Sequence, residues 1–563
     1  MATGSFSLLD HPWLPVRRAD GRVDRIRPDQ LTDFTGGAHA PVVALAAPRP
    51  DFNGALLEFL IGLVSTACPP ADGEAWDEGW QSPPSPETLR AAFSAHARAL
   101  VLDGAGPRFL QDEAALSGDE TGVEALLIDA PGQQTRSRNT DLFVHRDRVA
   151  RLSRPAAAWA LLTLQTYAPG GGAGHMTSLR GGGPLTTVVL PPADPPGSAT
   201  LWHLIWLNAE SRPDCEERRP SGAPADPAAI FPWLGPTRVS GKQGRRTTQA
   251  EVDPRHVWFA MPRRIRLAFR AAEPGEACDL TGEADPVMVA GYVTRPYGFQ
   301  YGEGGFRHPL SPYYRPKPGA DWLPVHGGPS GIGYRDWLAL TLESGESGEA
   351  TRRCAAGVSA ARARLAGLGG YDGVRLRAFG YDMDNMKARG WVEAEMPLLL
   401  SPDEDTRDRL HGTAAALVAA AQIIARATVD AIKEALFPNP KKNARGDFGH
   451  LEARFWRATE SAFFAALTAA AGQGRETEEA YLVPRRGFLR ALRAAAAALF
   501  DELAPVEGLE LAEFRRVVSA RSWLTGHFVP ELKDGRKVVE ALGLPPPEKP
   551  KARPSAKRRP AKT

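Results

Sequence analysis

Residues 401–436 read SPDEDTRDRLHGTAAALVAAAQIIARATVDAIKEAL. Apolar residues recur at helical spacing through this stretch, and an acidic first turn behind Ser401 is typical of a capped helix start. Similar patterns follow in three further segments, at 448–471, 485–504 and 511–524, with short joins that carry Pro, Gly or Asn. The four segments predict an antiparallel four-helix bundle over residues 401–544.

The chain before this stretch has a different pattern. Short β-like runs alternate irregularly with helical patterns and with connections rich in Pro and Gly. The runs are TTVVL (186–190), HVWFA (256–260) and VMVAGYVT (287–294), and the helical patterns cover 54–67 and 154–168. Because strands and helices do not alternate regularly, the sequence predicts a mixed α/β domain over residues 1–400 and an α+β fold overall.

The composition is that of a globular protein with more than one domain. The chain has 563 residues, of which 43% are hydrophobic and 24% charged, and its net charge is +2. This balance argues against a uniformly basic nucleic-acid-binding surface but leaves room for a local basic groove. Residues 545–563, rich in Pro, Lys and Arg, predict a disordered basic tail that serves either solubility or nucleic-acid binding.

The sequence also predicts a cellular location. The four cysteines are far apart, which suits free thiols in a reducing cytosol. The N-terminus has no basic segment followed by an apolar one, so we expect no signal peptide. The most apolar run, residues 413–425, is short and has charges on either side, so we expect no membrane span. These features together predict a cytoplasmic protein.

A glycine-rich stretch, APGGGAGHMTSLRGGGPLTT (168–187), is the first candidate site. It has neither the G-x-x-x-x-G-K-[ST] pattern of a P-loop nor the G-x-G-x-x-G pattern of a dinucleotide-binding loop. It follows a predicted helix C-terminus, which is the wrong end of the helix dipole for an anion. We therefore expect no nucleotide cofactor. The turn CDLTG (278–282) has one cysteine where a zinc site needs several, so we expect no metal.

Arginine, glycine and aromatic residues occur together in several other segments. They include 240–248, 261–270 and 291–316, and RRIRLAFR (263–270) has the alternation of a strand with a basic face. Together these segments suggest a shared groove for a phosphate backbone. The sequence has no H-x-H, H-E-x-x-H or G-x-S-x-G motif. Two alternatives stay open: a metal- or nucleotide-dependent nucleic-acid enzyme built on DMDN (382–385), and a purely structural scaffold subunit.

Five segments, in this order, resemble the CasA family, the large subunit of the type I-E CRISPR surveillance complex (Cascade). They are FSLLDHPWLPVRR (6–18), LLIDAPGQQTRSRNTDLF (126–143), SLRGGGPLTTVV (178–189), GYVTRPYGFQYGEGGFRHPLSPY (291–313) and FGYDMDNMKARGW (379–391). From its residues alone, the last of these reads as a polar loop. The resemblance covers nearly the whole chain apart from the basic tail.

The resemblance implies a non-catalytic subunit that recognises the protospacer-adjacent motif (PAM) in the minor groove of double-stranded DNA. Three elements of the family grip this groove. A glycine loop corresponds here to Gly170, Gly171, Gly172, Ala173 and Gly174, where Ala173 stands in place of a glycine. A basic finger falls in VTRPYG, where the family's lysine aligns with Pro296 or a neighbour, so Arg295 is the candidate cation.

The third element is a wedge that starts strand separation. It corresponds to Asp384, Asn385, Met386 and Lys387. The family's glutamine is replaced by Asn385, or by Met386 if the register shifts by one. A side chain pushed into a base step unstacks it at a cost of a few kcal/mol. The R-loop then grows by a near-balanced exchange of base pairs, while the guide RNA reads the sequence, as in Cas9-type recognition.

The resemblance also implies partners. Leu127, Ile128 and Asp129 correspond to the element that docks on the crRNA 5′ handle and its backbone subunit. The helical bundle would contact the small subunits, help hold the displaced strand and shift to admit a trans-acting helicase–nuclease, to which cleavage belongs. No cofactor, metal or membrane is implied.

Overall fold

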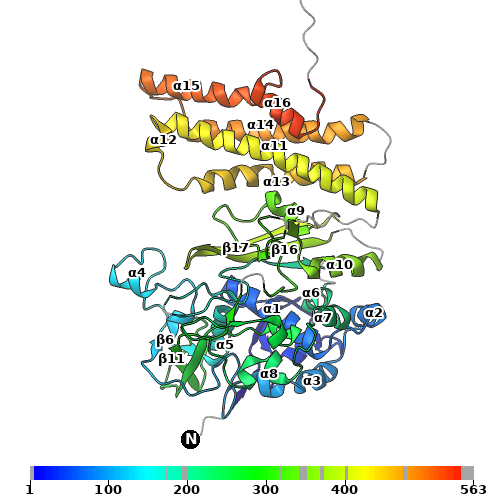
Figure 1. The fold of residues 1–563 in the computed structure, drawn as a ribbon, viewed down its shortest axis with the longest axis vertical. Coiled ribbons are helices and arrows are strands. Elements are labelled where there is room, and N and C mark those ends of the chain that lie inside the picture. Colours follow the sequence, from blue (N-terminus) through cyan, green and yellow to red (C-terminus); the bar gives the residue numbers. More distant parts are fainter. Residues whose placement is uncertain are drawn as a thin grey trace, which may run out of the picture. The chain divides into compact units, whose positions relative to one another are not determined.

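A computed structural model describes residues 5–172, 174–192, 199–302, 305–317, 319–341, 351–367, 373–399, 403–472 and 478–546. The chain divides into two compact units, Met1–Pro402 and Asp403–Thr563. The first, called here the N-terminal unit, combines helices with small sheets; the described part of the second, called here the helical unit, is built of helices (Figure 1). The predicted α+β class is confirmed. Residues 547–563, most of the predicted tail, lie outside the described residues.

The N-terminal unit is organised around helix α1 (Pro50–Ala67), which is buried on almost every side. A helix that is apolar all round belongs in a core, and α1 packs against α5 (Arg154–Tyr167) and α6 (Leu201–Asn208). The other helices of the unit are α2 (Gly73–Gln81), α3 (Pro86–Ser94), α4 (Gln133–Ser137), α7 (Arg212–Glu217), α8 (Pro227–Ile230), α9 (Trp337–Thr341) and α10 (Ala356–Gly367). Large aromatic side chains, Trp13, Phe52, Phe59 and Trp159 among them, fill the core around α1.

Two sheets of the N-terminal unit position the candidate site. In one, β16 (Arg375–Asp384) pairs antiparallel with β8 (Thr186–Leu190) and with β17 (Lys387–Pro397). In the other, β11 (Val287–Arg295) pairs antiparallel with β10 (Arg264–Ala271), with β6 (Thr121–Gly122) and with β7 (Leu152–Ser153). The strands predicted at 186–190, 263–270 and 287–294 are therefore confirmed.

The remaining strands of the unit form small pairings. They are β2 (Leu14–Arg18) with β3 (Val23–Ile26) and β4 (Val42–Leu45), β1 (Phe6–Ser7) with β5 (Val101–Asp103), β9 (Arg246–Thr247) with β12 (Gln300–Tyr301), and β13 (Tyr313–Tyr314) with β14 (Leu323–Pro324) and β15 (Arg352–Arg353). All are antiparallel except the β9–β12 pair.

Two sequence predictions in this unit are wrong. The run HVWFA does not form a strand, because Pro254–Trp258 is a 3₁₀ helix. The Asp253 side chain accepts from the Arg255 N–H and Pro254 occupies the first turn, so local capping overrides the β-like composition. The polar segment FGYDMDNMKARGW is not a loop but the tip of the β16–β17 hairpin.

The helical unit contains α11 (Glu404–Leu436), α12 (Pro440–Asn443), α13 (Gly449–Gly472), α14 (Glu478–Leu503), α15 (Leu511–Gly526) and α16 (Lys533–Ala541). Helix α11 packs against α13, α14, α15 and α16. Its cap is Asp403, which accepts from the Thr406 N–H at 2.8 Å; Ser401, the expected cap, lies outside the described residues. The long helices occur where the sequence predicts them, while their antiparallel bundle topology stays a prediction.

Helix α11 is long and apolar enough to cross a membrane by length and composition. Within Asp405–Leu436 the most apolar 18-residue window has a mean hydropathy of 1.6, and 56% of that window is buried inside the structure. Its buried positions, such as Leu417, Ile424 and Ile432, are those expected of a helix that packs against its neighbours.

Candidate nucleic-acid interface

The glycine loop begins directly after helix α5, which ends at Tyr167. The Ser178 N–H donates to the Ala168 carbonyl at 3.0 Å, so the chain returns beside its starting point. Inside the loop, Gly171 N–H donates to His175 O at 3.1 Å and His175 N–H donates to Gly172 O at 2.8 Å. The loop is therefore a closed turn fixed by its own main chain. Ala173 lies outside the described residues.

Gly170 and Gly172 face open space, whereas a Cβ on Gly171 would lie 2.8 Å from the Arg263 guanidinium and from the His175 Cβ. A Cβ atom on Gly170 would meet only the Met386 Sδ, at 3.8 Å, which is an ordinary van der Waals distance. A Cβ atom on Gly172, whose φ is +66°, would meet no atom of the described residues within 4 Å. At these two positions the glycines do not make room for another part of the protein. Their main chain is therefore accessible to a second molecule.

Gly174, in contrast, is held against the turn that follows strand β11. The Tyr297 N–H donates to the Gly174 carbonyl at 2.7 Å, and a Cβ on Gly174 would lie 2.7 Å from the Tyr297 ring. Tyr297 itself has a φ of +63°, which is uncommon for a bulky residue and needs support from its surroundings. The structure thus joins the glycine loop to the predicted finger segment, through Tyr297.

The Arg295 side chain contacts a different part of the N-terminal unit. It is exposed at the end of β11, and its Nη2 lies 3.3 Å from the Ser117 Oγ. A Cβ on Gly118 would lie 3.1–3.3 Å from the Arg295 guanidinium. The cation therefore rests against the Ser117–Gly118 segment, while Pro296 and Tyr297 contact the glycine loop.

The predicted wedge is the two-residue tip of the β16–β17 hairpin. Asp384 and Lys387 form its last pair, and Asn385 and Met386 form the turn. Asn385 has a φ of +54°, which asparagine tolerates better than most residues. The Met386 side chain is 58% exposed and is the neighbour of Gly170 noted above. The hairpin tip thus lies beside the open end of the glycine loop.

The second glycine run, 181–183, has a structural role. A Cβ on Gly183 would lie 2.6 Å from the Tyr381 carbonyl oxygen, and one on Gly182 would lie 2.8 Å from the Pro169 Cα. Gly183 also has a φ of +63°. These glycines let the chain return against strand β16, so they are required by the fold itself.

Arg263 supports the glycine loop. In the sequence it is marked only as one arginine of the basic segment 261–270. Its guanidinium donates to the Met176 carbonyl at 2.6 Å and also to the Pro169 carbonyl. Burial lowers the pKa of Arg263 to about 10, so the group is still a cation at neutral pH. It fixes both sides of the loop and leaves the open face free.

Replacing Arg263 by methionine is expected to loosen the loop, because two main-chain carbonyls lose their donor. The loss should cost about 1–3 kcal/mol. Amide hydrogen exchange should become faster at Gly171 and His175. The control is Arg266→Met in the adjoining strand β10, since Arg266 donates to the Asp112 carbonyl instead. Equal exchange in the two variants would contradict this role of Arg263.

Glu58 on helix α1 connects the two stems of the glycine-rich stretch. Its carboxylate accepts from the Tyr167 hydroxyl at 2.5 Å, from the Arg180 guanidinium at 2.5 Å and from the Thr186 hydroxyl at 2.6 Å. Burial and the charge of Glu58 raise the pKa of Tyr167 well above its usual value, so the hydroxyl stays a donor. No local pattern in the sequence marks this cluster, because Glu58 is more than 100 residues away from its three partners.

The predicted docking element, Leu127 to Asp129, is largely engaged within the N-terminal unit. Leu127 is buried, and Asp129 forms an ion pair with Arg49 at 2.9 Å. Further along the same segment, Leu142 and Phe143 are 74% and 94% exposed. The surface that this segment offers to a partner is therefore better developed at Leu142–Phe143 than at the predicted residues.

The remaining candidate sites have local explanations. The Cys278 turn is closed by Gly282 N–H donating to the Cys278 carbonyl at 2.8 Å. In the described part of the chain, no three His, Cys, Asp or Glu side chains form a group that could hold a metal ion. In the hairpin, Arg389 binds both carboxylate oxygens of Asp382, at 2.7 and 2.8 Å.

Comparison with known proteins gives consistent matches. The family model "CRISPR-associated protein Cse1" matches residues 7–499. The structure of Thermus thermophilus CasA (Cse1) is similar with a TM-score of 0.64 and 18% identity, over 93% of this chain and 99% of that one. Thermobifida fusca Cse1 gives a TM-score of 0.64 and 17% identity, over 96% and 98%. A chain of a CRISPR RNA-guided surveillance complex gives 0.65 and 20%, over 93% and 100%. At these identities the structural likeness establishes the fold.

Proposed function

Because the chain belongs to the Cse1 (CasA) family of CRISPR-associated proteins, we propose that it is the large subunit of a type I-E RNA-guided surveillance complex and recognises the PAM in double-stranded DNA. The family indicated by the sequence resemblance is confirmed by the match over residues 7–499. The proposed role is non-catalytic and cytoplasmic, with cleavage of the target assigned to a trans-acting helicase–nuclease.

One observation carries the proposal: the three candidate elements meet. Gly174 is hydrogen-bonded to Tyr297 in the finger turn, and Gly170 lies next to Met386 at the hairpin tip. The finger turn and the hairpin tip are each more than 100 positions from the glycine loop in the sequence, and two of the loop glycines face open space. An exposed main chain flanked by a turn and a protruding apolar side chain suits a groove with stacked base pairs next to it.

The geometry favours the minor groove. This groove is about 6 Å wide, so main chain without side chains enters it more easily than an ordinary loop. Its pattern of acceptors is degenerate, so a subunit that reads it would tolerate several PAM sequences. Arg295, at the edge of the site, would then contact the acceptors or phosphates beside the motif. The hairpin tip would open the first base pairs, and the guide RNA would read the rest.

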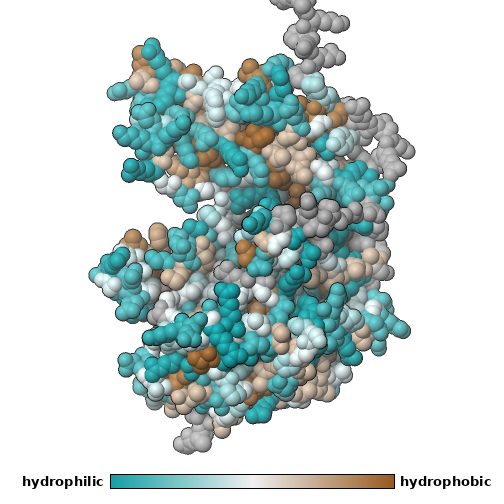
Figure 2. Space-filling model, viewed as in Figure 1, coloured by the Kyte–Doolittle hydropathy of each residue, from teal (hydrophilic) through white to brown (hydrophobic). Residues whose placement is uncertain are grey.

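The other partners follow from exposed surfaces. The segment that includes Leu127, Ile128 and Asp129 would dock on the crRNA 5′ handle and the backbone subunit, with Leu142 and Phe143 as its exposed apolar contacts. The helical unit would contact the small subunits, hold the displaced strand and admit the helicase–nuclease. Figure 2 shows hydrophobic residues between hydrophilic ones at the surface of this unit. On α15 the exposed apolar residues are Leu511, Phe514, Val518 and Trp523.

The wedge is tested by the double variant Asn385→Gly/Met386→Ala. Glycine keeps the positive φ of the turn, so the hairpin should fold while both side chains that enter the duplex are lost. R-loop formation by the assembled complex, followed by the reactivity of unpaired thymines, should fall by about ten-fold or more, since unstacking a base step costs a few kcal/mol. The control is Val23→Ala, at another exposed apolar side chain of the unit. Normal R-loop formation in the double variant would refute the wedge assignment.

A further inference from the structure

The loop Ser240–Arg246, called here the basic loop, lies beside the Tyr297 turn. The Ser240 N–H donates to the Tyr297 carbonyl at 3.0 Å, while the Tyr297 N–H donates to the Gly174 carbonyl at 2.7 Å. The main chain of Tyr297 is thus hydrogen-bonded to both the basic loop and the glycine loop. The Tyr297 turn consequently lies between the basic loop and the glycine loop.

The base of the basic loop is rigid. Arg246 and Thr247 of β9 pair with Gln300 and Tyr301 of β12, and the Thr247 side chain is buried. Within the loop, Arg245 N–H donates to the Ser240 carbonyl at 3.0 Å. These bonds restrict the loop before any partner binds, which lowers the entropy lost on binding.

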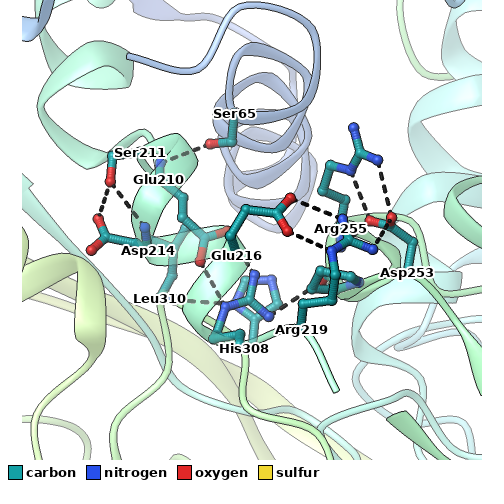
Figure 3. A network of polar contacts seen from close by, with 12 residues as sticks. Ser65, Glu210, Ser211, Asp214, Glu216, Arg219, Asp253, Arg255, His308 and Leu310 are labelled. Atoms are coloured by element: carbon teal, nitrogen blue, oxygen red, sulfur yellow. Dashed lines mark hydrogen bonds and ion pairs between the residues drawn. The ribbon is translucent and has the colours of Figure 1, made fainter. Parts of the chain in front are cut away.

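An ion-pair network fixes the chain that follows the loop. Asp253 is fully buried and is bound by Arg219 at 3.0 Å and by Arg255 at 2.7 Å (Figure 3). Burial opposes the charge of Asp253, but the hydrogen bonds from the arginines outweigh it and lower the pKa of its carboxyl. Glu216 continues the network through Arg219. Asp253, at the end of the segment that follows the loop, is thereby connected through Arg219 to Glu216 of helix α7.

The cations of the basic loop, Lys242 within it and Arg245 and Arg246 at its end, are exposed. Arg245 shares Glu251 with Arg238, at 2.9 and 2.7 Å. Lys242 and Arg246, in contrast, make no ion pair among the described residues. Unpaired cations on a restrained loop are available for an anionic partner without first breaking a bond.

We propose that Lys242 and Arg246 bind the phosphate backbone of the target duplex next to the PAM, and so extend the site formed by the glycine loop. The inference rests on the proposed function. Hydrogen bonds join Gly174 to Tyr297 and Tyr297 to Ser240, so the basic loop adjoins the finger turn that contacts the glycine loop. Phosphate contacts fix register and orientation but carry no sequence information.

The test is the double variant Lys242→Ala/Arg246→Ala, assembled with crRNA and the other subunits. Affinity for a PAM-bearing duplex should fall by about ten-fold at moderate salt, and the slope of log K against log salt should become shallower by about 1–2. The ratio of affinities for PAM-bearing and PAM-less duplex should not change. The charge-matched control is Arg98→Ala/Arg212→Ala, at two other exposed arginines of the same unit.

The outcomes separate the two proposals. If affinity and salt slope match the control, the basic loop does not bind DNA and this inference is wrong. If the variant fails to assemble with crRNA, the loop binds RNA or another subunit and the inference is equally wrong. A Gly170→Val variant measured in parallel reports on the PAM site itself. If it loses PAM discrimination while the double variant is normal, only the inference about the basic loop fails.

Discussion

Replacing Glu58 by alanine is expected to lower the free energy of unfolding of the N-terminal unit by about 3–5 kcal/mol, because it leaves a buried charge without its partner. The Arg180 side chain is 3% exposed and its guanidinium lies 2.5 Å from the Glu58 carboxylate. The Tyr167 and Thr186 hydroxyls lose their acceptor in the same step. Urea denaturation of the isolated subunit, followed by tryptophan fluorescence, measures the change.

Two comparisons make this result specific. Glu58→Gln keeps one side-chain oxygen as an acceptor and the shape of the side chain, but it removes the negative charge. It should therefore destabilise the unit less than Glu58→Ala does. Glu216→Ala breaks an ion pair whose carboxylate is 54% exposed, and such pairs contribute about 0–1 kcal/mol. If Glu58→Ala costs no more than Glu216→Ala, the cluster does not hold the stems of the glycine-rich stretch together.

Replacing Gly170 by valine is expected to leave stability close to that of the natural protein and to reduce binding of PAM-bearing DNA strongly. The residue has no positive φ, and a Cβ there meets only the flexible end of Met386. The added side chain would instead project into the space assigned to the minor groove. A loss of about 2–3 kcal/mol, or roughly 30- to 150-fold in affinity, is expected for the assembled complex.

Gly183→Ala is the matched control for that substitution. Its positive φ should cost about 1–3 kcal/mol, and the clash with the Tyr381 carbonyl adds to this cost. It should therefore destabilise the fold, whereas Gly170→Val should not. If thermal melting showed that Gly170→Val is the less stable of the two variants, the assignment of Gly170 to an open site and of Gly183 to the fold would be wrong.

Much of the fold could be predicted from local pattern. The period of apolar residues locates α1, α5 and the long helices of the second unit, and β-branched runs locate β8 and β11. The HVWFA run was predicted wrongly because a capped Asp253–Pro254 turn decides its conformation. The β16–β17 hairpin was missed because its exposed strand carries charged side chains and its turn lacks glycine.

The candidate site was predictable only in part. Resemblance to a family supplied the three segments, but not the side chains that connect them. Tyr297, Arg263 and Glu58 act through contacts with residues about 80 to 120 positions away, such as Gly174 and Arg180. Such contacts have no signature in a single sequence, since nothing local distinguishes a tyrosine that supports a glycine from one that fills a core. The structure also directs Arg295 toward Ser117.

Site-specific photocrosslinking tests the central proposal most directly. A photoreactive amino acid placed at Met386, which is 58% exposed, would be activated in the assembled complex bound to a labelled target. We expect crosslinks to nucleotides of the PAM and the first base pair of the protospacer, and none from the same group placed at Val23. Crosslinks from position 386 only to crRNA, to other subunits or to DNA far from the PAM would contradict it.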